Sequence, residues 1–197
     1  GNTVIAEVTD YTTFKILGST TDDAAGECFD KTARCLGLEY PGGVTLDKIA
    51  TTPDFTKYPL PTPKVQGEFD FSFSGLKTFA VNLVHNASQK GETVKAEDLG
   101  ASFIKAVTDL LTSHTMEAAK DTGSKTIVLA GGVSANSRLR RVMQEECDKR
   151  GIKLFMPELK YCGDNAAMIA SQGYYEYLDG KRADLTLNAV ASMAIDE

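Results

Sequence analysis

The sequence predicts an α/β fold, in which parallel strands alternate with helices, and two observations support it. Residues 126–136, TIVLAGGVSAN, form an apolar run that stops at two glycines and restarts as a helix. The segment 127–129 lacks polar alternation, which is typical of a strand buried on both faces. A second apolar strand at 152–155 follows that helix and leads into another one, so the β-α-β connection makes the two strands parallel.

Size, composition and charge set the broad class. The 197 residues are 42% hydrophobic, enough to build a core as one large or two small lobes. No apolar run approaches the roughly 20 residues of a membrane helix, and the first residues do not resemble a signal peptide, so we expect a soluble protein without membrane contact. Four cysteines without a C-x-x-C pair indicate free thiols and a cytoplasmic location. The net charge of −6 disfavours nucleic-acid binding through the overall field, but net charge does not address a local basic strip.

The N-terminal region predicts a hairpin followed by a helix. Residues 3–8 and 14–18 are β-rich runs joined by a short turn at 9–11. The apolar positions then switch to helical spacing over 23–36, with Asp23 as the expected N-cap, and a glycine follows as the stop signal.

Three polar or glycine positions near this helix are candidate ligand contacts. Asp30 points away from the apolar stripe, and it either pairs with Arg34 one turn later or lines a cleft. Gly43 begins the next helix, where it presents backbone N–H groups. Asp47 lies one turn inside that helix, at a position where a carboxylate is usually just exposed.

The middle of the chain predicts an irregular stretch and two helices. Four of the six prolines fall within 53–63, which excludes regular structure there. Ser74 is the expected N-cap of the next helix, and the absence of a G-x-S-x-G elbow argues against a nucleophilic serine. A longer helix starts near Asp98. His114 on its apolar stripe is typical of a core histidine, and His85 lies near a helix end.

The glycine turn and the second parallel strand predict a ligand site at one sheet edge. Gly131 and Gly132 let a phosphate approach the main chain, and Ser134 or Asn136 can cap the following helix. Asp164 follows the second strand, so it lies at the same edge. It either caps the last helix or points at a metal or a phosphate-bound cation.

Three arginines, Arg138, Arg140 and Arg141, cluster in the helix that begins after the glycine turn. Two interpretations remain open for them, contact with a phosphate and contact with solvent alone. The next glycine, Gly151, ends this helix and precedes the second parallel strand.

Five sequence blocks resemble, in order, the TsaD family of tRNA N6-adenosine threonylcarbamoyltransferases. They are TDDAAGECFDK at 21–31, YPGG at 40–43, DFSFSGLK at 70–77, AGGVSAN at 130–136 and CGDNAAM at 162–168. The resemblance implies an actin-like ATPase (ASKHA) fold with a ribonuclease-H-like lobe and inserted helices. Residues 1–197 are then expected to be mostly the second of two lobes, with the first lobe absent.

The resemblance also implies which residues bind ligands. The implied adenylate contacts are Gly1, Asp30, Gly43, Asp47, Gly131, Gly132 and Asn136. Asp164 is implied as one ligand of a divalent metal, iron or zinc, and no catalytic residue is assigned. Asn2 stands where the family has a histidine. The family's His-x-x-x-His pair is missing, and His85 and His114 are too far apart to imitate it, so one carboxylate is left as a poor metal site.

The implied activity is an acyl transfer. The threonylcarbamoyl group moves from threonylcarbamoyl-AMP to the N6 amine of an adenosine in the anticodon loop of tRNA, which forms t6A. The implied partners are tRNA and the bacterial proteins TsaB and TsaE. Alternatives are a phosphotransferase of the same superfamily and a non-catalytic nucleotide-binding or assembly lobe. The lobe alone is expected to be almost inactive, and peptidase chemistry is disfavoured because H-E-x-x-H is absent.

Overall fold

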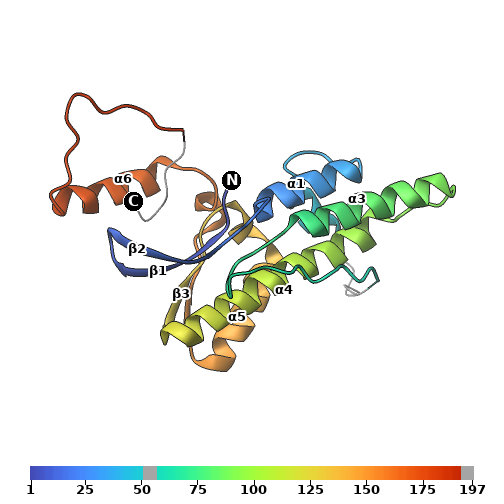
Figure 1. Ribbon diagram of the computed structural model, residues 1–197, viewed down its shortest axis with the longest axis horizontal. Helices are drawn as coiled ribbons and strands as arrows, with labels where there is room; N and C mark the ends of the chain where they lie inside the picture. Colours follow the sequence, from blue (N-terminus) through green and yellow to red (C-terminus); the bar gives the residue numbers. More distant parts are fainter. Residues whose placement is uncertain (51–56, 192–197) are drawn as a thin grey trace.

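The structure, a computed structural model that describes residues 1–50 and 57–191, combines helices with two small strand pairs (Figure 1). The strands are β1 (Val4–Asp10), β2 (Thr13–Ser19), β3 (Thr126–Val128) and β4 (Lys153–Phe155). The helices are α1 (Ala25–Cys35), α2 (Gly42–Ile49), α3 (Ser74–Gln89), α4 (Ala96–Thr122), α5 (Ser137–Arg150) and α6 (Ala166–Leu178), with short 3-10 turns η1 (Gly132–Ala135) and η2 (Leu159–Tyr161). β1 and β2 lie between α6 and the other helices (Figure 1). The predicted α/β character is confirmed.

The strand pairings agree with the local sequence signals. β1 and β2 form the predicted antiparallel hairpin, in which Val4 pairs with Ser19. β3 and β4 are parallel, as the β-α-β rule requires, and Ile127 lies opposite Leu154. Within the described residues these are two separate two-stranded sheets rather than one continuous sheet.

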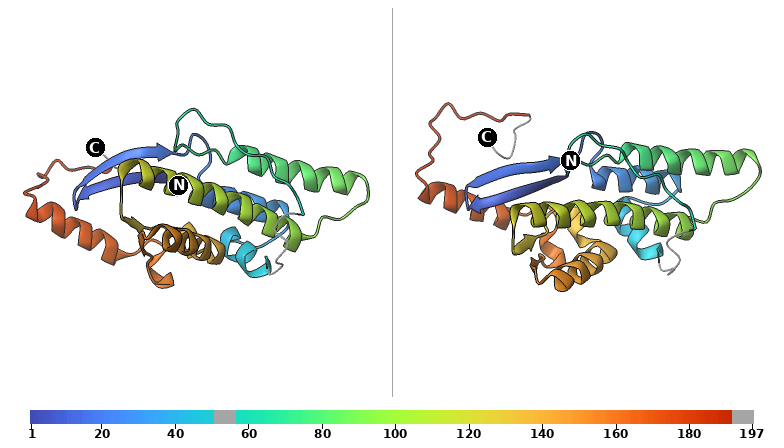
Figure 2. Two further views of the ribbon diagram at one scale, coloured as in Figure 1. Left: turned by 90° about the horizontal axis from the view of Figure 1, so that it is seen from below. Right: turned by 60° about the horizontal axis from the view of Figure 1, so that its bottom comes forward.

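The main core lies between α4 and the helices α1, α2 and α3, and α5 packs along α4 next to α2 (Figure 2). Its largest side chains are aromatic, and Phe29 of α1 meets Phe103 of α4 edge to face at 5.8 Å. Phe71 and Phe73, which precede α3, are completely enclosed. A second, smaller cluster joins α5 to β3 and to the end of α4. These two clusters fix the helices that carry the candidate site.

One expectation about β3 is wrong. Ile127 is only 8% exposed, but Val128 is 67% exposed, so the strand is buried on one face and not on both. Ile127 packs among Met116 and Met143, while the described elements leave the opposite face uncovered.

Two predicted N-caps are also wrong. The N-cap position of α1 is Ala24, and Asp23 pairs with lysines instead. α3 begins at Ser74 itself, with Phe73 at the N-cap position. The predicted stop after α1 is confirmed, because Gly37 takes a φ of +74°. In the proline-rich stretch, residues 53–56 lie outside the described residues, and 59–65 contain no helix or strand, as expected.

Helix α6 lies apart from the helical body and contacts the tip of the β1–β2 hairpin (Figure 1). Tyr11 stacks on Tyr175 with ring centroids 3.8 Å apart, and the Gln172 side chain donates a hydrogen bond to the Tyr11 carbonyl at 3.2 Å. None of the residues of α6 is buried. In the described ranges no helix is both long and apolar enough to span a membrane.

Candidate functional site

Asp22 joins the first sequence block to the turn that starts α3. Its carboxylate accepts hydrogen bonds from the hydroxyls of Ser72, at 2.5 Å, and Ser74, at 2.6 Å, and from the backbone N–H groups of Phe73 and Ser74. Burial alone raises the pKa of Asp22, but these four bonds outweigh it and lower the pKa to about 2. Asp22 therefore supplies from a distance the cap that Ser74 was expected to supply locally.

Asp23 binds two lysines from different helices. Its oxygens lie 2.6 Å from Nζ of Lys77 on α3 and 3.0 Å from Nζ of Lys31 on α1. Both ammonium groups lower the pKa of this carboxyl. The sequence analysis missed these roles of Asp22 and Asp23; the signal was an Asp doublet in one block and a Ser-x-Ser-x-x-Lys spacing in another.

Asp30 fixes the start of α2. Its Oδ1 accepts a hydrogen bond from the backbone N–H of Gly42 at 2.8 Å, and not from Arg34. Gly42 is buried against α1, where an added Cβ would lie 2.6 Å from the Cβ of Ala33. Gly43 follows and is half-buried, with room around it. Asp30 and Gly43 thus both lie at the entrance of α2, and the pairing of Asp30 with Arg34, one of the two alternatives from the sequence, is not formed among the described residues.

Asp47 and Asn136, far apart in sequence, bind one another at the start of α5. Asn136 Nδ2 donates to Asp47 Oδ1 at 3.0 Å, and Ser137 donates to Asp47 through its backbone N–H and its hydroxyl. Asn136 Oδ1 accepts from Leu139 N at 2.9 Å, which confirms it as the N-cap. Asp47 Oδ2 accepts only the Ser137 N–H among the described residues, so a lone pair remains for a ligand hydroxyl.

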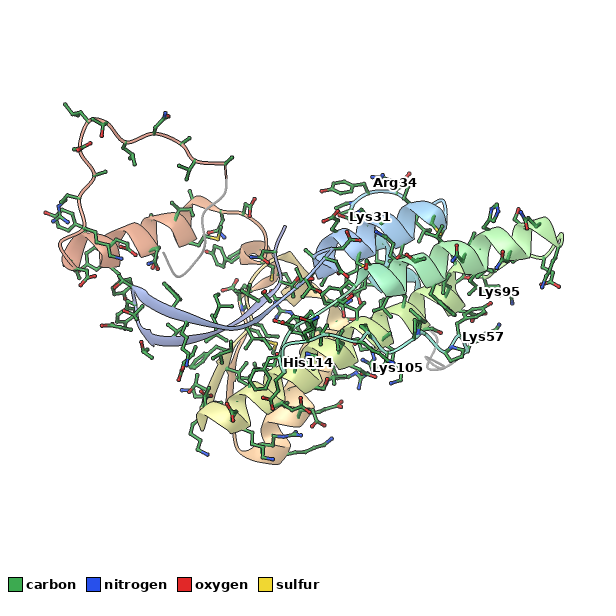
Figure 3. All side chains as sticks on the ribbon, in the orientation of Figure 1. Lys31, Arg34, Lys57, Lys95, Lys105 and His114 are labelled. Atoms are coloured by element: carbon green, nitrogen blue, oxygen red, sulfur yellow. The ribbon has the colours of Figure 1, made fainter. Side chains whose placement is uncertain are left out.

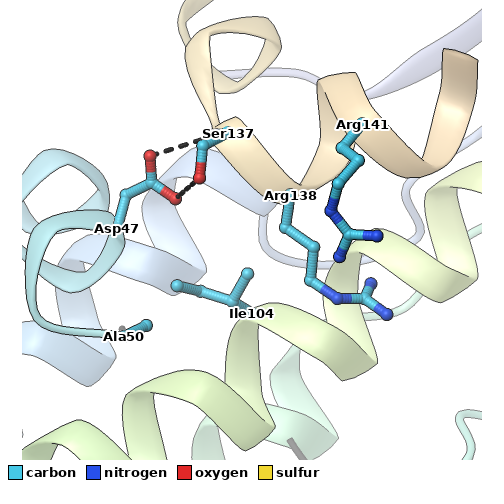
Figure 4. A pocket seen from close by; sticks show the side chains of 6 residues that line it. All are labelled: Asp47, Ala50, Ile104, Ser137, Arg138 and Arg141. Atoms are coloured by element: carbon cyan, nitrogen blue, oxygen red, sulfur yellow. Dashed lines mark hydrogen bonds between the residues drawn. The ribbon is translucent and has the colours of Figure 1, made fainter. Parts of the chain in front are cut away.

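A pocket of about 260 Å³ opens beside Asp47 (Figure 4). Its other lining residues are Ala50, Ile104, Ser137, Arg138 and Arg141. Arg138 is mostly buried and binds Asp109 at 2.7 Å, and Arg141 pairs with Glu145 at 2.9 Å. The pocket combines an apolar floor with two guanidinium groups, a combination that suits a flat, partly polar ring.

A larger hollow of about 550 Å³ lies at the carboxyl ends of β3 and β4. The glycine turn and Asp164 both line it, so the prediction that they share one sheet edge is confirmed. Gly131 has a φ of +86° and a ψ of 169°, a conformation that is essentially restricted to glycine. Asp164 is exposed and does not cap α6; Asn165 does so, accepting from Met168 N at 3.0 Å.

Arg140 connects the loops on the two sides of this hollow. Its Nε donates to the carbonyl oxygen of Ser134 at 2.7 Å, and its Nη2 donates to that of Pro157 at 2.6 Å. The same Nη2 lies 3.2 Å from Sγ of the buried Cys162, two residues before Asp164. Of the three arginines left open by the sequence, Arg138 and Arg141 line the smaller pocket and Arg140 bridges the larger one.

Gly1 lies at the start of α1, where an added Cβ would be 3.4 Å from the Cβ of Ala24. Thr3 Oγ1 accepts from the Ala25 N–H at 3.0 Å, so the first residues of the chain cap α1. Gly26 of α1 in turn faces Val133 of η1. The N-terminal turn and the glycine loop therefore meet through the start of α1.

The described residues do not fit a complete metal site. No group of three or more His, Cys, Asp or Glu side chains in ranges 1–50 and 57–191 is placed to hold an ion. His85 bonds to Gln89 at 2.9 Å on α3, and His114 stacks on Phe71 at 5.2 Å (Figure 3). Neither histidine joins Asp164, which alone is too weak a ligand set for a transition metal.

Comparisons with known proteins identify the family of the chain. The family model described as "TsaD: tRNA N6-adenosine threonylcarbamoyltransferase" matches residues 1–171. The relative of that name from Caldicellulosiruptor saccharolyticus is 44% identical over 99% of this chain, and the one from Moorella thermoacetica is 45% identical over all of it. The chain spans 58% of the length of each of these two relatives.

Two solved structures share the fold at low sequence identity. Full-length HypF in a phosphate- and nucleotide-bound form has a TM-score of 0.58 at 17% identity, covering 79% of this chain and 20% of its own. HypF of T. kodakarensis gives the same TM-score at 20% identity, covering 80% and 20%. With the family model matching most of the sequence, the chain belongs to the TsaD family of tRNA N6-adenosine threonylcarbamoyltransferases.

Proposed function

We propose that this chain supplies the adenylate-binding side of an enzyme that transfers a threonylcarbamoyl group from threonylcarbamoyl-AMP to the N6 amine of a tRNA adenosine. The observation that carries the proposal is the pair formed by Asp47 and Asn136 at the start of α5. The family resemblance implies both residues as adenylate contacts. Their direct contact supports one site made from α2 and α5.

In this proposal the nucleotide is held by groups that the chain already orients. Asp47 Oδ2 and the Asp30 carboxylate accept ribose hydroxyls, and the N–H of Gly43 lies nearby at the start of α2. The pocket beside Asp47 holds the adenine ring between Ile104 and the guanidinium groups. Fixing the leaving nucleotide in this way lowers the entropic cost of the transfer.

The acyl phosphate lies, in the same proposal, toward the glycine turn. The backbone of Gly131 and Gly132 is open to close approach, because an added Cβ at either position would meet nothing within 4 Å. Gly1 belongs to the same phosphate-binding region at the start of α1. A divalent metal, iron or zinc, would orient the acyl phosphate and polarise its carbonyl, with Asp164 as the one ligand supplied here.

The wider assignment follows from the family. We propose that residues 1–197 form mostly the second, ribonuclease-H-like lobe of a two-lobe protein of the actin-like ATPase superfamily. The proposed partners are tRNA, TsaB and TsaE, and the proposed location is the cytoplasm. The four cysteines are free in the structure, which is compatible with a reducing compartment.

Calorimetry and a transfer assay on the full-length protein test the proposal. We expect AMP or ADP to bind and Asp47→Ala to weaken that affinity about tenfold. The matched surface variant Asp148→Ala should leave the affinity unchanged, because the exposed Asp148 side chain pairs with Gln144 on the same helix, α5. Transfer of the threonylcarbamoyl group to tRNA is expected from the same protein. Absence of adenine-nucleotide affinity contradicts the proposal. Nucleotide binding without transfer would indicate a non-catalytic lobe, and phosphorylation of a small acid or sugar would indicate a phosphotransferase.

A further inference from the structure

The two loops of the proposed site are joined by very little backbone pairing. β3 and β4 pair over only three residues each, and the last bond between them runs from Leu129 N to Phe155 O at 2.9 Å. Beyond that point one chain becomes the glycine loop, 130–136, and the other becomes the loop 156–164 that ends at Asp164. So short a ladder leaves the spacing of the loop ends to side-chain contacts.

Arg140 provides these contacts from a rigid position. It lies in the first turn of α5, which Asn136 and Asp47 cap, and its guanidinium reaches the carbonyl of Ser134 in one loop and that of Pro157 in the other. Its third partner, the thiol of Cys162, is only 4% exposed and belongs to the second loop. One planar group therefore touches both loops at once.

The chemistry of these contacts requires arginine. Nε and Nη2 are fixed in one plane and donate in neighbouring directions, so they reach two carbonyl oxygens that belong to different loops. A lysine ammonium is a single point on a flexible stem and cannot hold both oxygens in the same geometry. The three partners of Arg140 are two carbonyls and a thiol, none of which carries the negative charge of a carboxylate.

We propose that Arg140 is a positioning residue that fixes the distance between the glycine loop and the Asp164 loop. This role rests on the proposed function: the two loops face one bound acyl-adenylate, and Arg140 sets how its phosphate and its acyl carbonyl are presented to them. Arg140 does not touch the substrate. Loss of the contact displaces the reacting end while the adenine and ribose contacts around Asp47 stay in place.

The test compares Arg140→Met and Arg140→Lys in the full-length protein with Arg150→Met, a matched variant at the far end of α5 whose arginine only pairs with Glu146. We expect Arg140→Met to lower kcat of threonylcarbamoyl transfer about a hundredfold and to change KM for the adenylate less than about threefold. Arg140→Lys keeps the charge but not the fork, and we expect a loss of about tenfold. Arg150→Met should behave as the wild type.

Alkylation by iodoacetamide, followed by mass spectrometry, gives a readout that is independent of activity. In Arg140→Met we expect Cys162 to react at least about tenfold faster than in the wild type, while the fully buried Cys28 and Cys147 keep their rates. Equal acceleration of all three thiols would indicate general unfolding and overturn the positioning role. A rise confined to Cys162 with an unchanged kcat would overturn it as well. Absence of transfer by the wild type overturns the proposed function together with this role, whereas an active wild type with an unimpaired Arg140→Met overturns this role alone.

Discussion

Replacing Asp22 with Asn should destabilise the fold by an amount that depends on pH. The variant keeps the shape of the side chain but loses the charge that accepts four hydrogen bonds from Ser72, Phe73 and Ser74. Lowering the pKa of Asp22 from 3.8 to about 2 corresponds to a contribution of at most about 2.4 kcal/mol to the free energy of unfolding, at about 1.36 kcal/mol per pKa unit. Because water screens an exposed carboxylate, we expect the free energy of unfolding to fall by about 1 kcal/mol at pH 7.

The sign of the pH dependence follows from the lowered pKa. Folding favours the ionised form of Asp22. Its contribution to the free energy of unfolding is therefore fully present above the pKa that Asp22 has in the unfolded chain, and it is lost as the pH falls through the pKa that Asp22 has in the folded protein. The difference between the wild type and Asp22→Asn should be constant from about pH 7 to about pH 5, shrink below about pH 4 and vanish only when the pH falls below about 2.

Urea unfolding followed by circular dichroism at several pH values measures this difference. Asp184→Asn is the matched control, because the pKa of Asp184 is also lowered, but only by the neighbouring Thr186. Its effect should stay within about 0.5 kcal/mol, as for most surface changes. A wild-type advantage over Asp22→Asn that is equal at pH 3 and pH 7, or absent at pH 7, would refute the capping role of Asp22.

Four further substitutions test other parts of the site. Gly42→Ala should lower the free energy of unfolding by about 1–3 kcal/mol in thermal unfolding, because its Cβ would meet that of Ala33 at 2.6 Å. Gly43→Ala should instead stabilise α2 by up to about 1 kcal/mol. Equal effects of the two substitutions would contradict the close approach at Gly42. Asp47→Ala should also reduce the free energy of unfolding by about 1 kcal/mol through loss of its bonds at the start of α5, and an unchanged urea midpoint would argue against this. Gly131→Ala should cost about 1–3 kcal/mol by calorimetry because of its φ of +86°, and an unchanged melting temperature would show that the loop relaxes without strain.

Local signals predicted most of the secondary structure. The hairpin, the parallel pair and the cap at Asn136 depend on residues close together in sequence or on the fixed handedness of β-α-β units. The common sheet edge of Gly131 and Asp164 follows from the same rule, and the structure confirms it. These features needed no knowledge of distant contacts.

The wrong N-caps share a physical cause, which is that side chains found distant partners. Asp23 was expected to cap its own helix, but Lys77 of α3 offered a stronger charged partner. A carboxylate at the position of Asp47 is usually just exposed, yet Asp47 binds Asn136, 89 positions later in the chain. Val128 has the apolar pattern of a buried strand, and whether such a residue is covered depends on elements that hydrophobicity alone does not specify.

The contact between helix α6 and the hairpin tip has a consequence for the order of folding. Gln172 and Tyr11 are 161 positions apart, and Thr12 bonds to Asp179 across 167 positions. The entropy lost in closing so large a loop is offset here by one aromatic stack and a few exposed hydrogen bonds. We therefore expect α6 to dock late, on a finished hairpin, and to be released from the native state at low cost, because its contacts are few and exposed.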